Sequence, residues 1–214
     1  EKDLLRFYRG FTPNLLKVSL GKFGDTALYT YFHQPDFKYL SNEWRSTYIA
    51  LASSFIKFNL MPLDTYTNMY QVRGKEGSIV MKQKIKRDGI RVLYHGSTAF
   101  FLSNFLGNAS WFYTLDYLNS KLYKSYHKKD DTKKNIIIGF GCSTVSDLIT
   151  NPIRILKTYK QSNKENISYL QALKEIKESK GWRNFYFRGL GTKLILNGLN
   201  SSLFLVLWKK LENY

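Results

Sequence analysis

Residues 61–77, with the sequence MPLDTYTNMYQVRGKEG, place Pro62 and Asp64 directly after a mostly apolar stretch. Proline kinks a helix, because its ring removes a backbone donor and clashes with the preceding turn. Within lipid, the carbonyl that the proline frees needs a partner from a neighbouring helix or side chain. An acid just after such a kink either pairs with a base from another segment or serves as a solvated turn or capping residue. The segment alone leaves both interpretations open.

The chain offers few side-chain sets for catalysis or metal binding. Its three histidines, His33, His95 and His127, lie too far apart for a local metal motif, and no glycine-rich phosphate loop or cysteine–histidine arrangement is present. The single cysteine, Cys142, excludes an internal disulfide framework and a cysteine-based zinc site. We therefore expect a protein that is not an enzyme and has neither a metal site nor a catalytic cofactor.

The charge balance points to an anionic neighbour. Lys and Arg number 33 against 16 acids, which gives a formal net charge of +17. Such a balance is typical of proteins that bind nucleic acid or an anionic membrane surface. The basic stretches, at 82–87, 121–134 and 157–180, lie between apolar segments and do not form a patch with stacking aromatic residues. We expect membrane lipids, and no nucleic acid, as the partner.

Five apolar segments are candidate membrane spans. Residues 97–115 contain no charged side chain, and their length approaches the ~20 residues that cross a bilayer core. Residues 135–153 carry only Asp147 as an acid, and residues 194–208 are free of charge. Residues 11–32 and 44–63 tolerate a few charges. The alternative is a soluble all-helical protein with buried helices.

The same motifs recur along the chain. An aromatic–basic–glycine sequence ends at Gly10, Gly96 and Gly189, at intervals of 86 and 93 residues, and each opens a candidate span. Pro62 and Pro152 lie 90 residues apart, each ending an earlier span and preceding a polar segment that is helix-like. The repeating unit is a span, a proline, a surface segment, the glycine motif and a second span.

These motifs resemble the mitochondrial carrier family, whose three tandem repeats each supply two transmembrane helices and a short surface helix. The resemblance implies an all-α membrane helical bundle with tandem helix-pair repeats. Residues 1–40 would be the second half of repeat 1, residues 41–130 repeat 2 and residues 131–214 repeat 3, together forming one transmembrane domain. The first helix of the family pattern is expected to be missing from this chain, which begins at Glu1 without a signal peptide.

The resemblance also assigns gate residues at the two ends of a central cavity. At the matrix end it pairs Asp64 with Lys157, whereas Arg154 replaces an acid and would need an acidic partner from the missing region. At the opposite end Asp116 keeps the acid of one pair, but Asn119 occupies the place of its base. No complete acid–base pair is expected there, and Thr30 with Asn119 is a candidate substitute link. The other substituted positions are His33, Trp208 and Leu211.

The resemblance implies solute contacts about seven residues beyond each glycine motif. This count gives Lys17, then Ser103 with Asn104, then Leu196 or Asn197. Lys17 would attract an anionic group, because an unpaired charge near the bilayer middle is costly and usually functional; the alternative is a lysine that extends to the interface. Asp147 either lines the cavity or bonds a neighbouring polar residue.

The glycine motifs are candidate lipid sites. A helix N-terminus with free backbone N–H groups and a nearby cation binds phosphate, and the family uses this arrangement for cardiolipin. We therefore expect cardiolipin or another anionic lipid at three places, with simple helix capping by glycine as the alternative. The residues are Arg9 with Gly10, His95 with Gly96, and Arg188 with Gly189.

Two functions follow from the resemblance. The first is transport of a small, anionic solute by alternating access across the mitochondrial inner membrane, with Lys17 and the Ser103/Asn104 pair as contacts. The second is a non-transporting accessory subunit of a larger inner-membrane assembly, such as a respiratory complex. The lost gate pairs favour the second, because a subunit held in one conformation does not need both gates.

Overall fold

The computed structural model describes residues 11–37, 39–123, 132–163, 165, 167–187 and 189–212, and within these ranges it contains helices and no strand. The expectation of an all-α fold is confirmed. The long helices are α1 (Phe11–Phe32), α2 (Asn42–Asn59), α5 (Ser97–Tyr123), α6 (Thr132–Ser162) and α8 (Leu190–Glu212). The shorter ones are η2 (Pro35–Phe37), α3 (Met61–Arg73), α4 (Lys75–Asp88), η3 (Ile90–Tyr94) and α7 (Tyr169–Phe187).

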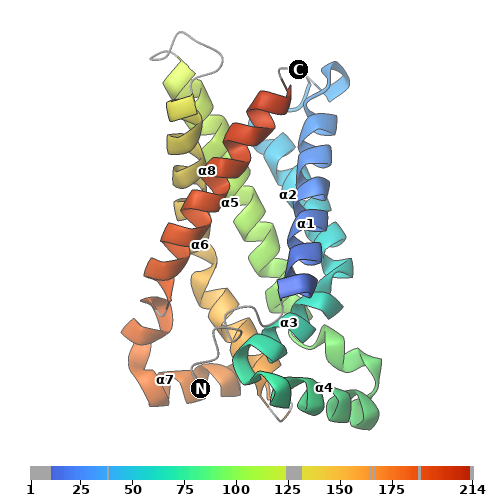
Figure 1. Cartoon of the computed structure of the whole chain (residues 1–214). Helices are drawn as coiled ribbons and strands as arrows, with labels where there is room; N and C mark the ends of the chain where they lie inside the picture. Colours follow the sequence, from blue (N-terminus) through green and yellow to red (C-terminus); the bar gives the residue numbers. More distant parts are fainter. Residues whose placement is uncertain are drawn as a thin grey trace.

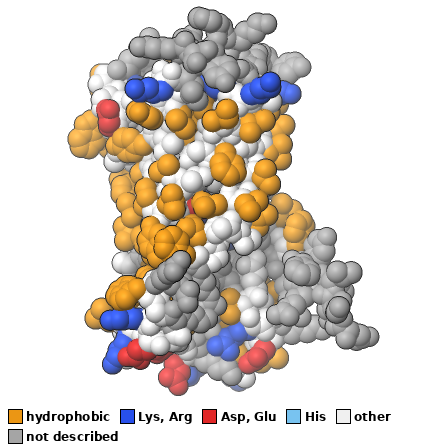
Figure 2. All heavy atoms as spheres, turned by 90° about the vertical axis from the view of Figure 1, so that its left-hand side faces the viewer, with side chains coloured by type: hydrophobic (Ala, Val, Ile, Leu, Met, Phe, Trp, Pro, Cys, Tyr) orange, Lys and Arg blue, Asp and Glu red, His pale blue; other side chains and the backbone are white. Residues whose placement is uncertain are grey.

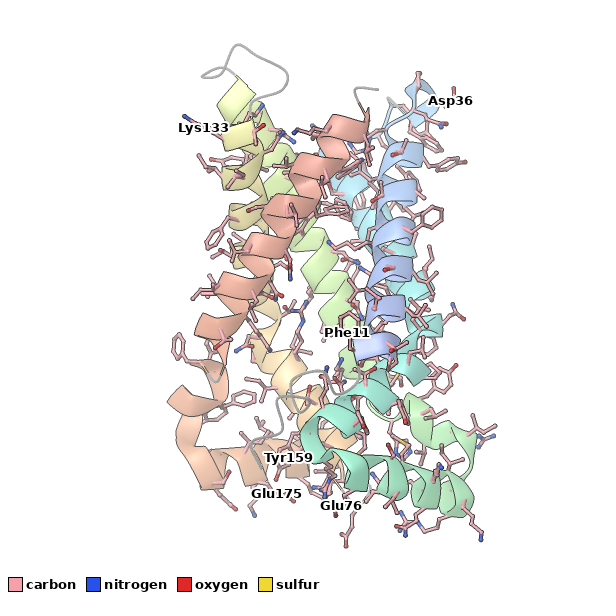
Figure 3. All side chains as sticks on the ribbon, viewed as in Figure 1. Phe11, Asp36, Glu76, Lys133, Tyr159 and Glu175 are labelled. Carbon is pink, nitrogen blue, oxygen red and sulfur yellow. The ribbon has the colours of Figure 1, made fainter. Side chains whose placement is uncertain are left out.

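The five long helices run side by side, and the shorter helices α3, α4 and α7 gather at one end of the bundle (Figure 1). Helix α2 packs against α1 and α5, while α6 packs against α5 and α8. Asp36 and Lys133 mark one end of the bundle, whereas Glu76, Tyr159 and Glu175 mark the other (Figure 3). We call these the Asp36 end and the Glu175 end.

The two prolines act differently. Helix α2 ends at Asn59, and Pro62 lies in the first turn of α3, so the chain breaks there as expected. Pro152, expected at the end of a span, lies inside α6, which continues as a helix to Ser162. Pro152 leaves the carbonyl of Leu148 without its helical donor, and the Tyr186 hydroxyl donates to this carbonyl at 2.8 Å. A side chain from α7 therefore allows α6 to pass the proline.

Helices α3 and α4 are both anchored to the end of α6. Arg73 Nε donates to the carbonyl of Ser162 at 2.7 Å, and the Lys84 ammonium donates to the carbonyl of Asn163. The last carbonyls of a helix lack intrahelical donors and carry partial negative charge, so cations stabilise them. Burial, together with the charge of Arg73, lowers the pKa of Lys84. The carbonyl bond offsets part of the cost of burying this ammonium.

The outer surface is apolar between two charged ends. Figure 2 shows a band of hydrophobic side chains around the middle of one face, with Lys and Arg above it and charges of both signs below it. Phe23, Phe55, Ile137 and Leu199 are each more than half exposed. Among the described residues, two segments are long and apolar enough to cross a membrane, Thr132–Ser162 and Phe185–Leu211. The other long helices, α1, α2 and α5, also contribute polar residues to an interior cavity.

A core cluster joins all five long helices toward the Asp36 end. Tyr29 stacks on Phe112 with ring centroids 5.5 Å apart, and the edge of Trp208 meets Tyr29 at 4.9 Å. Such aromatic pairs each add about 0.5–1.5 kcal/mol beyond the burial of their area. The buried members are Tyr29, Ile49, Phe112, Leu115, Ile138, Cys142, Leu205 and Trp208.

Substituting Gly139 should separate α6 from α8. A Cβ at this position would lie 2.6 Å from the Cα of Ser202, which is backbone and cannot rotate away. We expect Gly139→Ala to destabilise the protein by about 1–3 kcal/mol, measured as a lower melting temperature in detergent. Gly191→Ala is the matched control, because nothing lies within 4 Å of its Cβ position. Equal melting temperatures for the two variants would contradict this packing.

Candidate functional site

A cavity of about 610 Å³ lies inside the bundle, and all five long helices and α3 line it. This volume falls within the ~300–1,000 Å³ of typical ligand pockets. Among the described residues six cations line the wall against three carboxylates, which gives a formal excess of three positive charges. The cations are Lys17, Lys22, Lys57, Arg154, Lys157 and Lys193, and the acids are Asp25, Asp64 and Asp147.

Asp64 accepts from two lysines on two other helices. The Lys157 ammonium lies 2.8 Å from Asp64 Oδ2, and the Lys17 ammonium lies 3.0 Å from Asp64 Oδ1. The expected contact between Asp64 and Lys157 is therefore present. Lys17, expected to be an unpaired charge, instead shares this carboxylate. The three side chains join α3, α6 and α1 near the Glu175 end.

A chain of amides and hydroxyls holds the Asp64 carboxylate in place. Asn68 Nδ2 donates to Asp64 Oδ2 at 3.0 Å and to Gln161 Oε1 at 2.7 Å. Gln161 Nε2 donates to Thr65 Oγ1 at 3.1 Å, and Thr65 donates to the carbonyl of Leu93 at 2.7 Å. Because each buried polar group has a partner, the cluster resists local rearrangement.

A second buried ion pair was not anticipated from the sequence. The Lys57 ammonium lies 2.7 Å from Asp25 Oδ2 and donates to Asn108 Oδ1 at 3.0 Å. Asn108 Nδ2 donates to Ser53 Oγ at 2.7 Å, and Ser53 donates to Asp25, which closes a ring of bonds across α1, α2 and α5. A signal was available, because Lys57 precedes Pro62 by the same five residues that separate Asp147 from Pro152.

Arg154 has its acidic partner on its own helix. Its Nη1 lies 2.9 Å from Asp147 Oδ1, and Asn197 Nδ2 donates to Asp147 Oδ2 at 2.8 Å. The prediction that Arg154 requires an acid from a missing region is therefore wrong, because residues seven apart fall on the same face after two helical turns. Next to it, the Lys193 ammonium donates to Asn151 Oδ1 at 2.9 Å.

Lys22 contacts aromatic rings on two helices across the cavity. Its ammonium lies 4.5 Å from the ring centroid of Phe204 and 5.5 Å from that of Trp111. Trp111 Nε1 donates to Ser201 Oγ at 3.0 Å. The contacts link α1, α5 and α8, and the cation–aromatic attraction is strongest where water is excluded. Trp111 and Phe204 follow their glycines, Gly96 and Gly189, by the same fifteen residues, so the repeat could have identified them.

The expected solute contacts divide between the cavity and the outer surface. Lys17, Ser103, Asn104 and Asn197 line the cavity. Leu196 does not line it and is 56 % exposed, so its assignment as a solute contact is corrected. Successive residues on a helix point about 100° apart, and only one of two neighbours can face the interior.

Asp116, expected in a gate at the Asp36 end, lies outside the cavity wall. It accepts from Ser46 Oγ at 2.8 Å and from the Tyr29 hydroxyl at 3.4 Å. Thr30 and Asn119, both described, do not hydrogen-bond to each other, so that expected substitute link is absent. Hydroxyl donors on neighbouring helices provide the substitute.

The candidate lipid residues are only partly described. Gly96 and Gly189 have φ angles of 87° and 65°, a region that favours glycine, and each carbonyl accepts a bond of the helix that follows. His95 offers its carbonyl to Gln161 Nε2 at 3.4 Å. The Tyr169 hydroxyl accepts from the Ala99 amide at 3.2 Å, and so occupies one amide at the start of α5. Arg9, Gly10 and Arg188 lie outside the described residues.

Removing the charge of Asp64 should destabilise the bundle. Asp64→Asn leaves two lysines with only a neutral acceptor, and breaking a buried pair from one side costs about 3–5 kcal/mol. We expect a lower melting temperature in detergent, with partial recovery when Lys157→Gln is added. Asp36→Asn, in the exposed η2 turn, is the control. A melting temperature of Asp64→Asn equal to that of Asp36→Asn would show that the pair adds no stability.

Known proteins match the chain at a distance. Residues 128–214 match the family described as "Mitochondrial carrier protein". The chain is 28% identical over 142 residues to "Nicotinamide adenine dinucleotide transporter 1, chloroplastic" of Arabidopsis thaliana, covering 58% of this chain and 45% of the relative. It is 22% identical over 197 residues to "Peroxisomal adenine nucleotide transporter 1" of Saccharomyces cerevisiae, covering 76% and 60%.

The chain thus spans about half the length of the curated relatives that it matches. Its helices, its proline and glycine motifs and these matches agree with one another. The chain is thus similar to mitochondrial carriers, over residues 128–214 for the family match, and both relatives are named as transporters.

Proposed function

We propose that this protein carries a phosphorylated, nucleotide-like anion across an organelle membrane. The observation that carries the proposal is the cavity wall, where six cations face three carboxylates. A cation within a membrane protein is costly unless it is paired, and such residues commonly mark a solute pathway. An anionic solute would balance the excess charge while it occupies the cavity.

The cavity also offers surfaces for a planar ring. Phe100, Trp111 and Phe204 line the wall together with the cations. Aromatic faces stack favourably on flat ring systems. The two relatives are named as transporters of nicotinamide adenine dinucleotide and of adenine nucleotides. A solute with a base and a phosphate matches both the aromatic and the cationic parts of this wall.

Lys17 connects solute binding to the gate at the Glu175 end. Its ammonium, which lines the cavity, is bound to Asp64, which also binds Lys157. An anion that draws Lys17 away from Asp64 removes one of the two ion pairs between α3 and its neighbours. The solute thereby lowers the cost of opening this end, and the remaining pair with Lys157 can close it again after release.

We place the protein in the mitochondrial inner membrane, although the relatives are named as chloroplastic and peroxisomal. An anionic lipid such as cardiolipin would bind at the starts of α5 and α8, near Gly96 and Gly189. The backbone amides at these helix starts, apart from the Ala99 amide that bonds to Tyr169, and the basic loops favour a phosphate headgroup. Subcellular fractionation tests the location, and native mass spectrometry without retained lipid would contradict the lipid assignment.

The alternative is an accessory subunit that does not transport, held in a larger inner-membrane assembly such as a respiratory complex. Among the described residues, Asp116 forms no acid–base pair and accepts only from hydroxyl groups, which favours the accessory subunit. We prefer transport, because cations in excess of acids around an interior cavity are costly, and a purely structural subunit would gain no function from them.

Uptake into liposomes tests the proposal. The reconstituted full-length protein should take up labelled ADP, ATP or nicotinamide adenine dinucleotide with saturation. Lys17→Met should raise the KM by about tenfold, since a hydrogen bond to a charged group contributes about 1.5–3 kcal/mol. Lys174→Met on α7 is the control, because this side chain is 75% exposed.

Two results would decide between the two functions. Saturable uptake that falls in Lys17→Met and persists in Lys174→Met supports the carrier. No saturable uptake of any nucleotide or small anion, with a partner that co-purifies in fixed stoichiometry, overturns transport and supports the accessory subunit.

A further inference from the structure

The charge that follows the proline is reversed between the two segments that contain Pro62 and Pro152. Asp64 lies two residues after Pro62, and Arg154 lies two residues after Pro152. Arg154 bonds to Asp147 within α6, and its side chain is 34% exposed to the cavity. The reversal therefore adds a cation to the cavity wall in place of an acid.

Lys193 supplies a second cation beside this arginine from the facing helix α8. Its ammonium donates to the Asn151 side-chain oxygen at 2.9 Å, and Asn151 is fixed because its own amide donates to the carbonyl of Tyr186 at 2.6 Å. Among the described residues no carboxylate forms an ion pair with Lys193. A neutral amide thus holds a lysine whose charge is not matched by an acid.

The wall around this pair has an uncompensated positive charge. Arg154, Lys157, Lys193 and Lys17 face only two acids, Asp64 and Asp147, which leaves an excess of two. Arg154 uses Nη1 for Asp147, and no other bond of its guanidinium is formed with the described residues. A guanidinium can bind two oxygens of one phosphate, while an ammonium acts as a compact point charge.

Arg154 and Lys193 both line the cavity, which provides space for an anion at this wall. Gly107 on α5 lies next to α6 here, since a Cβ at this position would lie 3.3 Å from Ser146 Oγ and Thr150 Cγ2 and 3.5 Å from Arg154 Nη2. The helices that carry the two cations, α6 and α8, pack against each other. Beside the cations they are joined by the hydrogen bonds from Lys193 to Asn151 and from Asn197 to Asp147.

We propose that Arg154 and Lys193 form a phosphate subsite between α6 and α8, which binds the phosphate end of the transported solute. The subsite rests on the proposed transport function and specifies its substrate class. An excess of two charges favours a dianion, such as a terminal phosphate monoester, over a monoanion. Asp147 lowers the affinity of the subsite for the solute, because it binds one edge of the Arg154 guanidinium when no solute is bound.

Transport kinetics with AMP test the subsite in the full-length protein. Arg154→Gln and Lys193→Gln should each raise the KM for AMP by about tenfold, with a smaller change in the maximal rate. Arg154→Lys should recover part of the affinity. Lys174→Gln on the exposed face of α7 is the matched control and should behave as the wild type.

Asp147→Asn separates a binding role from a structural one. The substitution removes the acid that competes for Arg154, so the KM for AMP should fall. A purely structural ion pair predicts the opposite, a less stable protein with no gain in affinity. Thermal stabilisation by AMP in detergent reads out binding without transport, which covers variants that reconstitute poorly.

The possible failures are distinguishable. Wild-type uptake of AMP with an unchanged KM in both Arg154→Gln and Lys193→Gln would overturn the subsite and leave the transport proposal standing. A wild-type protein that takes up nicotinamide adenine dinucleotide but neither takes up AMP nor is stabilised by it would overturn the subsite alone. A wild-type protein that neither takes up nor is stabilised by AMP, ADP, ATP or nicotinamide adenine dinucleotide would overturn both proposals. Loss of AMP stabilisation in the two variants, but not in Lys174→Gln, supports the subsite.

Discussion

One carboxylate, that of Asp64, connects three helices at the Glu175 end of the bundle. It sits just after the break between α2 and α3 and accepts from Lys17 on α1 and Lys157 on α6. In a membrane protein neither the acid nor the lysines can remain buried alone, because each isolated charge is costly. The inward turn at Pro62 and the path of α6 past Pro152 are therefore both needed to bring the partners together.

The two ends of the bundle are closed by different interactions. Ion pairs and amides hold the Glu175 end, whereas stacked and edge-on rings of Tyr29, Phe112 and Trp208 hold the Asp36 end. The energy of an aromatic contact changes gradually with the distance between the rings. A buried ion pair, in contrast, is costly to break, because each charge is then left without a partner. We infer that the Glu175 end opens mainly when an anion replaces Asp64 as the partner of Lys17, and that the Asp36 end needs no such exchange.

The cavity shows how repeated helices acquire an asymmetric interior. Equivalent positions in the three glycine-opened helices carry Asp25, Trp111 and Phe204, so one level of the wall is partly ionic and partly aromatic. The cations also differ between helices, because Lys193 on α8 corresponds to Phe100 on α5. An asymmetric solute, with a ring at one end and a charge at the other, fits such a wall better than a symmetric one.

The sequence by itself determined the long helices and the cation excess, because apolar runs and charge are local properties of the chain. The repeat also predicted the contact between Asp64 and Lys157, because equivalent positions in related repeats face a common axis. Tertiary structure decided which charges pair: Lys17 with Asp64, Lys57 with Asp25 and Arg154 with Asp147. It also placed Asn197, not Leu196, in the cavity. Ion-pair choice depends on distances of a few ångströms between helices, and these are set by packing that spacing along the chain does not encode.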